Sequence, residues 1–389
     1  MSELSYLEKL LDGVKVEWKT LEKVLKRTKG TKITAGQMKA LHKDNAPLKI
    51  FAGGKTVAFV DFKDIPEKDI NREPSIIVKS RGIIEFEYYD KPFSHKNEMW
   101  SYHSNNDAIS IKYIYYFLKI NEGYFQKIGG KMQMPQIATP DTDKFEVPIP
   151  CPDNPEKSLA IQSEIVRILD KFTALTAELT AELTAELNMR KKQYNYYRDQ
   201  LLSFKEGEVE WKTLGEVAQF KRGTAITQKQ TTLGEIPVVA NGPIPTYFHS
   251  ESNRQGETIV IARSGAYAGY VSFWDQPIFL TDAFSVHSDL KIVKPKFIYH
   301  VLQNKQEHIH AMKKGAGVPH VRVKEFETYD IPIPPITEQD RIVSILDKFD
   351  TLTNSITEGL PREIELRQKQ YEYYRDLLFS FPKPETVSK

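Results

Sequence analysis

A long segment of this chain occurs twice, and each copy has the pattern of a very long helix. Residues 164–204, EIVRILDKFTALTAELTAELTAELNMRKKQYNYYRDQLLSF, return 177 positions later as residues 341–381, RIVSILDKFDTLTNSITEGLPREIELRQKQYEYYRDLLFSF, with 23 of 41 aligned positions identical and no gap. Apolar residues recur at the spacing that forms one stripe of an α-helix. A helix of ~44 residues, rising ~1.5 Å per residue, is roughly 65 Å long. So long a stripe needs an equally long partner, and because a large domain separates the copies, we predict an antiparallel pair of rods.

The ends and the middle of the two rods carry helix start and stop signals. Ser158 and Thr337 have the side chains of N-caps, and Asp340 follows Thr337 at the spacing of a capping box. In the second rod, Gly359 and Pro361 interrupt the helical pattern. We therefore predict a kink or a restarted helix there.

A second repeat extends the first one to the start of the chain. Leu10-Leu11 followed by VEWKTL at 16–21 repeats Leu201-Leu202 followed by VEWKTL at 209–214, so the N-terminus has the sequence of a rod's tail. The chain is then a circularly permuted two-fold repeat, which usually means quasi-symmetry. We expect a rod-tail segment at 1–13, a globular domain at 14–152, a central helix at 153–208, a second globular domain at 209–335, a C-terminal helix at 336–381 and a disordered tail at 382–389.

The two intervening domains are divergent copies of each other. Their matching segments include SIIVKSRG at 75–82 with TIVIARSG at 258–265, and MPQI at 134–137 with VPHV at 318–321. Short β-branched runs such as 259–262 and 270–274 predict strands, and the segments beginning at Lys112 and Lys296 each predict one amphipathic helix. Each domain is therefore α+β. The Pro-rich exits at 148–155 and 332–335 cannot continue a strand or a helix, so they mark the passage into the rods.

Composition limits the class of protein. The chain has 389 residues, a net charge of +2 and one cysteine, Cys151, which excludes a disulfide framework and fits a reducing cytoplasm. No run of apolar residues is long enough for a membrane span, and no secretory signal is present, so we expect a cytoplasmic protein. The small net charge alone does not indicate a nucleic-acid partner.

The arrangement resembles the specificity subunits of type I restriction–modification systems, in the type IC group. The resemblance covers essentially the whole chain. It rests on the exit before each rod, VPIP at 147–150 and IPIP at 331–334, on EQDRIVSILDKF at 338–349 and on QYxYYRDxLxSF at the rod ends. It implies a non-catalytic subunit whose two globular domains are target recognition domains, each reading half of a bipartite, asymmetric site in double-stranded DNA. The rods would set the gap and bind two modification subunits, and two restriction subunits would complete the complex. S-adenosylmethionine, ATP and Mg²⁺ would belong to those partners.

The first rod carries three tandem copies of Thr-Ala-Glu-Leu at residues 176–187. One unit adds ~6 Å of helix and rotates the far end by ~40°. That length is about two base-pair steps of B-DNA at ~3.4 Å each, so the repeat predicts a spacer device. A neutral stretch of good helix formers is the competing interpretation. The residues predicted for the partner or spacer face of the rods are Leu175, Leu179, Leu183, Leu187, Tyr194, Tyr197, Tyr371 and Tyr374.

The sequence contains no motif that assigns catalysis or metal binding to this chain. It has no NPPY-like motif of an amino-methyltransferase. The segment GGKT at 53–56 ends like a P-loop, but Lys49 stands where the first glycine would be, so a turn is the better interpretation. His308 and His310 have no Cys or acidic residue at metal-ligand spacing, so they fit a solvated helix face.

Base readout needs Arg, Lys, Asn, Gln and Ser on loops, with cations on phosphates. In the first domain the candidate DNA-binding residues are Lys26, Arg27, Lys79, Arg81, Lys127, Lys131, Gln133 and Gln136. In the second they are Lys221, Arg222, Arg263, Ser264, Tyr267, Lys313, Lys314, His320, Arg322 and Lys324. Arg81 and Arg263 lie beside glycines at strand ends, where the backbone could approach DNA closely.

Two hypotheses of other classes stay open. One is a coiled-coil adaptor that binds two proteins and no nucleic acid, for which DNA binding would be absent at every salt concentration. The other is a self-contained DNA methyltransferase or nuclease, which would be active as the purified chain with its cofactor. The missing motifs argue against the second.

Overall fold

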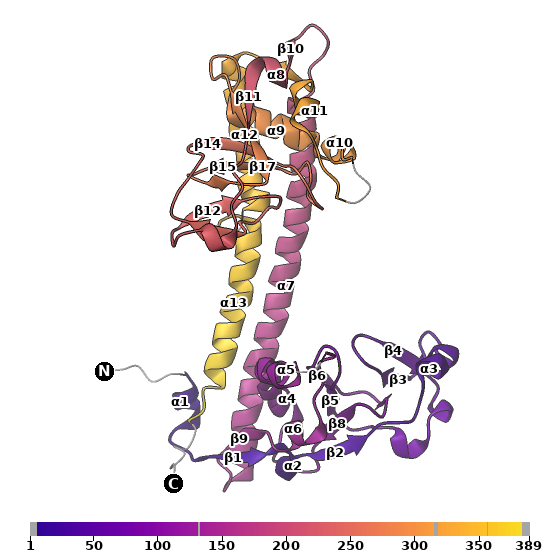
Figure 1. Cartoon of the computed structure of the whole chain (residues 1–389). Helices are drawn as coiled ribbons and strands as arrows, with labels where there is room; N and C mark the ends of the chain where they lie inside the picture. The colour runs from indigo at the N-terminus through magenta and orange to yellow at the C-terminus, as the bar shows by residue number, and fades with distance from the viewer. Residues whose placement is uncertain (1–5, 131–132, 315–317, 356, 383–389) are drawn as a thin grey trace. The chain divides into compact units, whose positions relative to one another are not determined.

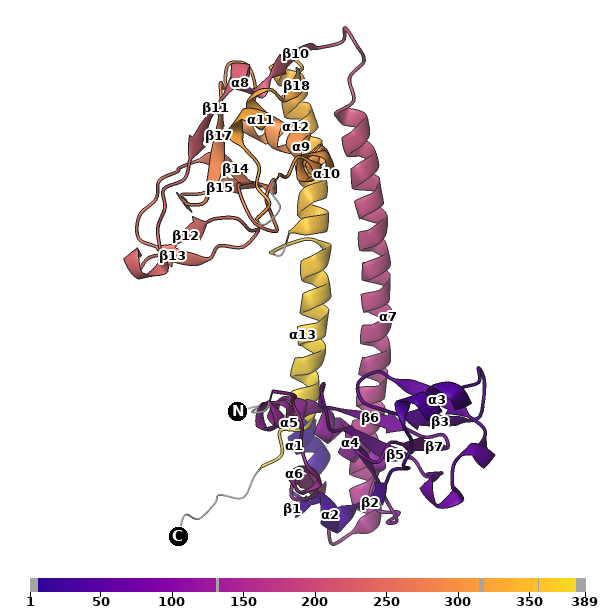
Figure 2. The ribbon, with the colours of Figure 1, turned by 45° about the vertical axis from the view of Figure 1, so that its right-hand side comes forward.

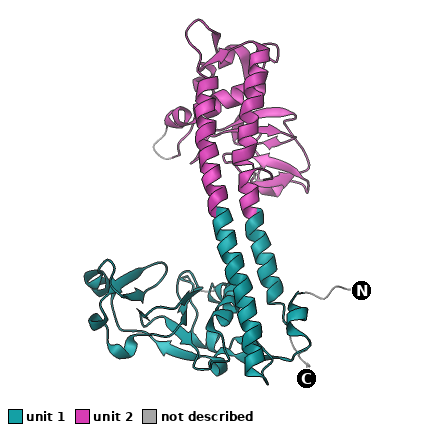
Figure 3. Ribbon diagram, turned by 180° about the vertical axis from the view of Figure 1, so that it is seen from behind, with its two compact units in different colours: residues 1–180, 366–389 teal, residues 181–365 magenta. Residues whose placement is uncertain are grey.

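The computed structural model describes residues 6–130, 133–314, 318–355 and 357–382 in two compact units. Figure 3 colours the units, which comprise residues 1–180 with 366–389, and residues 181–365. Each unit contains one globular domain and segments of the long helices (Figures 1 and 2). No helix within the described residues is long and apolar enough to cross a membrane.

The first globular domain is built on two small sheets and a strand pair. A four-stranded antiparallel sheet has the order β2 (Lys26–Lys29), β8 (Trp100–His103), β5 (Ser75–Lys79), β6 (Glu85–Tyr89). A three-stranded sheet has the order β4 (Val57–Val60), β3 (Leu48–Phe51), β7 (Phe93–His95), in which β3 and β7 are parallel. Strand β1 (Val16–Thr20) pairs with β9 (Glu146–Pro150). The helices are α1 (Tyr6–Leu11), α2 (Leu21–Val24), α3 (Ala35–Leu41), α4 (Ile111–Ile120), α5 (Glu122–Gly129) and α6 (Thr139–Asp143).

The second globular domain repeats this topology strand for strand. Its four-stranded sheet has the order β11 (Ala218–Arg222), β17 (Ala283–Ser288), β14 (Glu257–Ala262), β15 (Val271–Asp275). The three-stranded sheet is β13 (Tyr247–His249), β12 (Ile236–Val239), β16 (Phe279–Leu280), again with one parallel pair, β12–β16. Strand β10 (Glu210–Thr213) pairs with β18 (Asp330–Ile333). The helices are α8 (Leu214–Val217), α9 (Pro295–Asn304), α10 (Gln306–Ala311) and α11 (Val323–Glu327). The predicted α+β repeat is thus confirmed, with a second short helix after each predicted one.

The cores of both domains lie where a fully buried central strand meets an amphipathic helix. In the first domain Ile76 and Val78 of β5 are buried against Tyr113, Ile114 and Phe117 of α4. The second domain uses β14 and α9 in the same way. The spacing of three and four along α4 puts its apolar residues on one face, which explains why this helix covers the sheet.

Each rod is clamped to its globular domain by a glutamine and an aspartate that both copies of the repeat contain. Asp170 on α7 (Pro155–Leu201) accepts bonds from Lys112 (2.7 Å) and Tyr116 (2.5 Å) of α4. Asp347 on α12 (Ile336–Asn354) pairs with Lys296 (2.7 Å) and His300 (2.9 Å) of α9. The same acid therefore fixes each domain to a rod at the same point of the repeat.

The glutamine of each clamp binds backbone on both sides. Gln162 accepts from the amide of Ser110 and donates to the carbonyl of Ala108, each at 2.9 Å. Gln339 accepts from the amide of Lys294 at 2.9 Å and donates to the carbonyl of Ile292 at 3.0 Å. Buried polar groups are stable only when they are hydrogen-bonded in this way.

The rods pair within each unit as an antiparallel arrangement requires. In the first unit the start of α7 lies beside the end of α13 (Leu360–Leu378), where Phe172 contacts Tyr374 with ring centroids 5.8 Å apart. In the second unit the end of α7 lies beside α12, where Tyr194 and Tyr197 both stack on Phe349. The tyrosines that the sequence placed on the rod face thus form part of the helix pairing.

The leucines of the tandem repeat are less buried than the predicted stripe implied. Leu175 is 51% exposed, and Leu179, Leu183 and Leu187 are half-buried. The prediction that all four lie on a buried stripe is therefore wrong for Leu175. Phe172 and Thr176 of α7 are half-buried in its place, because steps of 100° move the buried stripe around the helix.

Both predicted helix caps are wrong. Helix α7 begins at Pro155, so Ser158 lies inside its first turn, and Asn154 caps it by accepting from the amide of Lys157 at 3.1 Å. Helix α12 begins at Ile336 after Pro335, which has no side chain that can accept, so Thr337 is already helical. Proline at the start of a helix supplies a fixed φ in place of a side-chain cap.

The predicted restart of the second rod is confirmed. Helix α12 ends at Asn354 and α13 begins at Leu360. Gly359 has φ +83°, and a Cβ there would stand 2.4 Å from the carbonyl oxygen of Thr351. Only glycine fits this position, so the break is a property of the second copy alone.

The Pro-rich exits form strands, contrary to the prediction. Pro148 pairs with Trp18 and Pro332 pairs with Trp211 in two-stranded ladders. Each ladder has a free edge, so a proline without an N–H is tolerated there. The strands β9 and β18 carry the chain from each domain to its rod.

The N-terminal segment packs as the predicted rod tail. Leu7 and Leu11 of α1 are buried in one cluster with Leu378 and Phe379 from the end of α13. The Trp18 indole donates to the carbonyl of Pro382 at 3.0 Å. Pro382 was assigned to the disordered tail; the other residues of that segment, 383–389, lie outside the described part of the chain.

Candidate nucleic-acid interface

The loops that follow β5 in the first domain and β14 in the second are each held by backbone hydrogen bonds to a second loop. In the second domain the amide of Gly265 donates to Pro319 and that of Val321 to Arg263, both at 2.9 Å. In the first domain the amide of Gly82 donates to Pro135 at 2.9 Å. The matched sequences MPQI and VPHV therefore occupy the same place in both domains and present Gln136 and His320 at equivalent positions.

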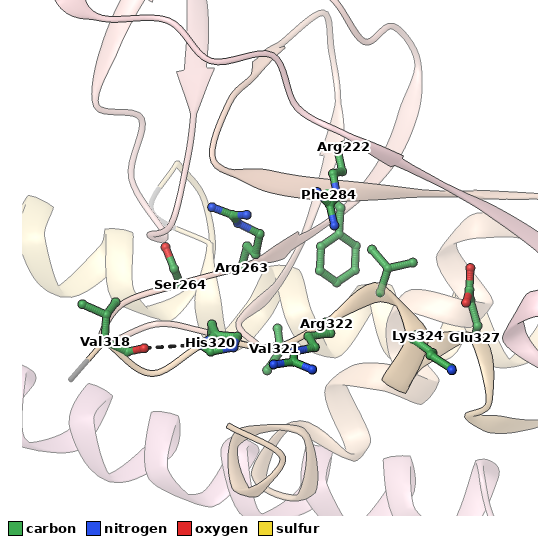
Figure 4. Close-up of a pocket in the computed structure, with 11 residues that line it drawn as sticks. Arg222, Arg263, Ser264, Phe284, Val318, His320, Val321, Arg322, Lys324 and Glu327 are labelled. Atoms are coloured by element: carbon green, nitrogen blue, oxygen red, sulfur yellow. Dashed lines mark hydrogen bonds between the residues drawn. The ribbon is translucent and has the colours of Figure 1, made fainter. Parts of the chain in front are cut away.

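Six of the residues predicted for the second domain line one cavity of about 620 Å³. Figure 4 shows how they surround it. They are Arg222, Arg263, Ser264, His320, Arg322 and Lys324. Glu327 is the one acid among the lining residues, so the cavity is strongly basic. Such a concentration of guanidinium and ammonium groups favours an anionic or hydrogen-bond-accepting ligand.

Arg263 lies at the centre of a polar network that the sequence did not reveal. Its guanidinium pairs with Asp282, at 3.0 Å from Nε and 2.8 Å from Nη2 to the same Oδ1 atom. Ser264 donates to the other oxygen of Asp282 at 2.8 Å, and the Asn241 amide also donates to it. Burial of Asp282 opposes its ionisation, but the bonds from Asn241 and Ser264 and the charge of Arg263 lower its pKa.

The other four residues predicted for the second domain do not line this cavity. Lys221 precedes Arg222 on a strand, so its side chain points to the opposite face. Lys313 donates to the carbonyl of Ala266 at 2.9 Å, and Lys314 pairs with Glu325 at 2.8 Å. Tyr267 is 51% exposed beside these loops.

In the first domain the predicted residues are more scattered. Lys79 is only 6% exposed, and its ammonium lies 2.7 Å from Glu85 and 2.8 Å from Glu87. Burial opposes that charge, but the two carboxylates outweigh it and raise the pKa of Lys79. The Lys79 ammonium is thus taken up by two carboxylates within the domain and is not available to DNA.

The remaining candidates of the first domain differ in how exposed their side chains are and in whether they form ion pairs. The Arg27 guanidinium pairs with Asp143 at 3.2 Å. Gln136 is half-buried in its loop. Lys131 lies outside the described residues. Arg27 is exposed despite its ion pair, as are Lys26, Arg81, Lys127 and Gln133.

The strand register shows which candidate residues of the two domains are equivalent. Matching Lys26-Arg27 with Lys221-Arg222, as two basic pairs of the sequence, is wrong: Lys29 pairs with Trp100 in the first domain as Arg222 pairs with Phe284 in the second, so the counterpart of Arg222 is Lys29. Sequence reasoning missed Lys29, although a signal was present. The pattern GTxITxxQ follows directly in both domains, at 30–37 and 223–230, with the same 193-residue offset as VEWKTL.

The shared GTxITxxQ segment makes the same Thr–Gln turn at the start of α3 in the first domain and of a 3-10 helix (Gln228–Gln230) in the second. Gln37 accepts from the amide of Thr34 and Gln230 from that of Thr227, each at 2.9 Å. Each turn lines a cavity, of about 740 Å³ beside Lys29 and about 620 Å³ beside Arg222. The two domains therefore share a hollow with Lys29 or Arg222 in its lining, flanked by a Thr–Gln turn.

The described residues contain no group of three or more His, Cys, Asp or Glu side chains that could hold a metal ion. His308 packs against Tyr329 with ring centroids 6.0 Å apart, and His310 lies 3.1 Å from the carbonyl of Ala268. Both histidines have structural contacts.

Comparison with known proteins gives a consistent result. A family described as the type I restriction modification DNA specificity domain matches residues 15–189 and again residues 206–366. The Escherichia coli type I restriction enzyme EcoR124I/EcoR124II specificity subunit is 45% identical over 421 aligned positions that cover 100% of both chains. This chain belongs to the type I restriction–modification specificity subunits.

Other members of the family agree. The specificity subunit of E. coli EcoprrI is 39% identical and covers 92% of this chain and 93% of its own. The solved S subunit from M. genitalium has the same fold, with a TM-score of 0.57 and 19% identity over 96% of this chain and 98% of its own. A subunit solved in a study of complex assembly of the type I system gives a TM-score of 0.60 at 13% identity, over 94% and 97%.

Membership in this family gives the site its meaning. A specificity subunit recognises DNA sequence, and the two matches to the family correspond to the two globular domains described above. Residues that the two domains share then support their common fold, whereas residues that differ at equivalent positions are candidates for base reading. Ser80-Arg81 in the first domain occupies the positions of Arg263-Ser264 in the second, and Gln136 occupies the position of His320.

Proposed function

We propose that each globular domain reads one half of a bipartite, asymmetric DNA site and that the rods fix the gap between the halves. One observation carries this proposal: two domains of identical topology are attached to equivalent points of the rods by Asp170 and Asp347, yet present different side chains from equivalent loops. An identical frame with different readers fits two different half-sites at a set spacing. DNA, which is rigid and periodic, is a suitable ligand for such a device.

The charges at the domain surfaces support DNA as the ligand. Arg222, Arg322 and Lys324 line the cavity around Arg263 and can neutralise phosphates, whereas Ser264 and His320 can bond base edges. In the first domain Lys29 lines a corresponding hollow, and Gln136 occupies the position of His320. Cations that position the domain and polar groups that read bases are thus present in each domain.

The repeated surface of the rods supports two copies of one partner. Tyr196 is 61% exposed and Tyr373, its counterpart in the repeat, is 64% exposed. Each packs edge-on against the next tyrosine, Tyr197 or Tyr374, at 5.4 Å between centroids. Exposed aromatic residues are typical anchors of protein interfaces. We infer that two modification subunits bind these equivalent surfaces and that two restriction subunits join them in the full complex.

In this proposal the chain itself is non-catalytic. Adenine methylation with S-adenosylmethionine and the ATP- and Mg²⁺-dependent restriction steps belong to the partners. The contribution of this chain is to select the DNA site and to hold the two methylating subunits at a fixed distance from each other, which matches the gap between the half-sites.

Reconstitution tests the proposal. The purified chain is expected to show neither methylation nor cleavage, and to confer methylation of one bipartite site when it is mixed with its modification subunit. Footprinting of the complex should show two short protected blocks separated by a gap. A uniform footprint on random DNA, or methylation by the chain alone, contradicts the proposal.

A further inference from the structure

We propose that Asp282 is a specificity-determining residue, which restricts Arg263 to an end-on contact with a single guanine in the half-site of the second domain. This inference rests on the proposed function, because it assumes that the second domain reads bases. It goes further by naming the base, the reading atoms and the residue that orients them.

The ion pair occupies one edge of the guanidinium. Arg263 has both Nε and Nη2 directed at Oδ1 of Asp282, at 3.0 and 2.8 Å. An arginine can present two forks to a bidentate ligand, one formed by Nε and an Nη atom and the other by the two Nη atoms. Asp282 fills the first fork. Only the second, end-on fork remains for another ligand.

Asp282 is itself held in place from two sides. Its Oδ2 accepts from Ser264 at 2.8 Å and from the Asn241 amide. The Oδ1 of Asn241 accepts from the backbone amides of Arg263 (3.2 Å) and Ser264 (3.3 Å), which closes the network. Side chains whose rotamers are locked in this way recognise ligands with a smaller entropy loss.

The free end of Arg263 is available to a ligand. The arginine side chain is 47% exposed, and Arg263 lines two adjoining cavities of about 620 Å³ each. Guanine presents O6 and N7 side by side in the major groove, and an arginine fork matches this pair of acceptors. No other base offers two adjacent acceptors on that edge.

The neighbouring carboxylate favours a base over a phosphate at this position. The Asp282 side chain is 40% exposed, so a phosphate placed against Arg263 would lie close to a second negative charge. A base edge is neutral and meets no such repulsion. Arg222, Arg322 and Lys324 line the same cavity outside the Arg263–Asp282 ion pair and suit phosphates better.

The first domain supplies a matched control. Glu98 lies two residues before Trp100, as Asp282 lies two residues before Phe284, so the two acids are equivalent. Glu98 pairs instead with Lys96 at 2.6 Å, and Arg81 occupies the position of Ser264. The clamped arginine is thus a feature of the second domain.

Two substitutions in the full complex test the proposal. Arg263→Lys keeps the charge and loses the fork, and Asp282→Asn keeps the shape and releases the arginine. Sequencing of the methylome of a host carrying each variant should show that both relax the same position, that this position is a guanine in the unaltered system, and that discrimination there falls about ten- to hundredfold. Glu98→Gln should leave that position unchanged.

A chemically altered DNA removes any dependence on variant folding. The unaltered complex should methylate an oligonucleotide carrying 7-deazaguanine at that position about tenfold or more slowly, because N7 is lost. The proposal is overturned if the two variants relax different positions or none, if the shared position is not guanine, or if 7-deazaguanine at the strict guanines of that half-site has no effect. Failure of the proposed function would look different, since the unaltered complex would then show no bipartite site at all.

Discussion

Asp170 and Asp347 are 177 positions apart and make the same kind of contact with lysines of α4 and α9. Their second partners differ, because Tyr116 in the first unit is replaced by His300, which is fully buried, in the second. A carboxylate in such a site is stable only while its partners donate to it. Replacing either carboxylate by an amide is therefore expected to weaken the attachment of a globular domain to its rod.

Asp347→Asn is expected to lower the free energy of unfolding of the second unit by about 1.5–3 kcal/mol, since the hydrogen bonds to Lys296 and His300 lose their charge assistance. Thermal or urea unfolding of the full chain measures this. Asp199→Asn is the control, because Asp199 is 62% exposed and its ion pair with Arg198 is long, at 3.9 Å. An equal loss in both variants would contradict the assignment.

The same aspartate predicts a pH dependence. Burial of Asp347 opposes its charge, but hydrogen bonds from His300 and Lys296 outweigh it and lower its pKa below the ordinary 3.8. A carboxylate with a lowered folded-state pKa contributes stability above its unfolded pKa and loses it as pH falls through the folded value. Stability should thus fall below about pH 4 in the unaltered chain, and less steeply in Asp347→Asn. Identical acid profiles would refute this linkage.

Gly223 predicts a steric effect of similar size. A Cβ at this position would stand 2.1 Å from the carbonyl oxygen of Thr281, a backbone atom that cannot move aside. Gly223→Ala should destabilise the second unit by about 1–3 kcal/mol through overpacking. Gly53→Ala is the comparison, since nothing lies within 4 Å of a Cβ there. Unfolding midpoints decide the matter, and equal midpoints for the two variants would show that the close approach relaxes.

At the scale of elements, one sequence repeat produces two different rods. Helix α7 runs unbroken for 47 residues, whereas the second copy is divided into α12 and α13 of 19 residues each. The tandem Thr-Ala-Glu-Leu units stand where the second copy has Gly359 and Pro361. The unbroken copy is the one whose length can change by whole tetrapeptides without a new cap or turn.

Deleting one Thr-Ala-Glu-Leu unit should shorten the non-specific gap of the recognised site and leave both half-sites unchanged. The reason is geometric, because four helical residues span ~6 Å, which is about two base-pair steps of B-DNA. The deletion also rotates the far end of the rod by ~40°. Methylome sequencing of the variant system measures gap and half-sites together. Altered half-site bases with an unchanged gap would contradict the idea that the rod is a ruler.

The sequence predicted the elements well where one physical signal dominated. Helical spacing over 41 residues identified the rods, and buried β-branched runs identified strands such as β14. The Asn154 cap could have been predicted, because Asn followed by Pro at the first helical position is a local helix-start signal. The proline strands could not be predicted, because they depend on a partner strand. Pro148 is acceptable in β9 only because its missing N–H faces the free edge of a ladder with β1.

The site was predictable only in part for the same reason. Arg263 and His320 are recognisable as loop residues, but whether a charge is free depends on its neighbours in space. Lys79 is buried between two acids of the next strand, and Asp282, 19 positions from Arg263, gave no local signal. Lys29 could have been found, because the GTxITxxQ repeat fixes the register with Arg222.

At the scale of the whole molecule, the proposed function makes the repeated rods a binding surface for two copies of one partner. Exposed Tyr196 and Tyr373 lie 177 positions apart at the same place in each rod end. Tyr373→Ala and Tyr196→Ala should each weaken binding of one modification subunit by about tenfold or more, as truncated aromatic anchors do. Native mass spectrometry should count one bound subunit in each single variant and none in the double variant.

The control for this experiment is Tyr124→Ala, which removes a tyrosine of similar exposure, 51%, from a globular domain. It should leave two modification subunits bound. Loss of both subunits from either single variant would show that the two surfaces do not act independently.

Single-molecule methylome sequencing of a host that carries the complete system tests the central claim most directly. Two different readers on one repeated frame predict methylated adenines in a single asymmetric motif, made of two short blocks separated by a constant number of unspecified bases. A continuous motif, two identical blocks, or methylation without regard to sequence would contradict the account.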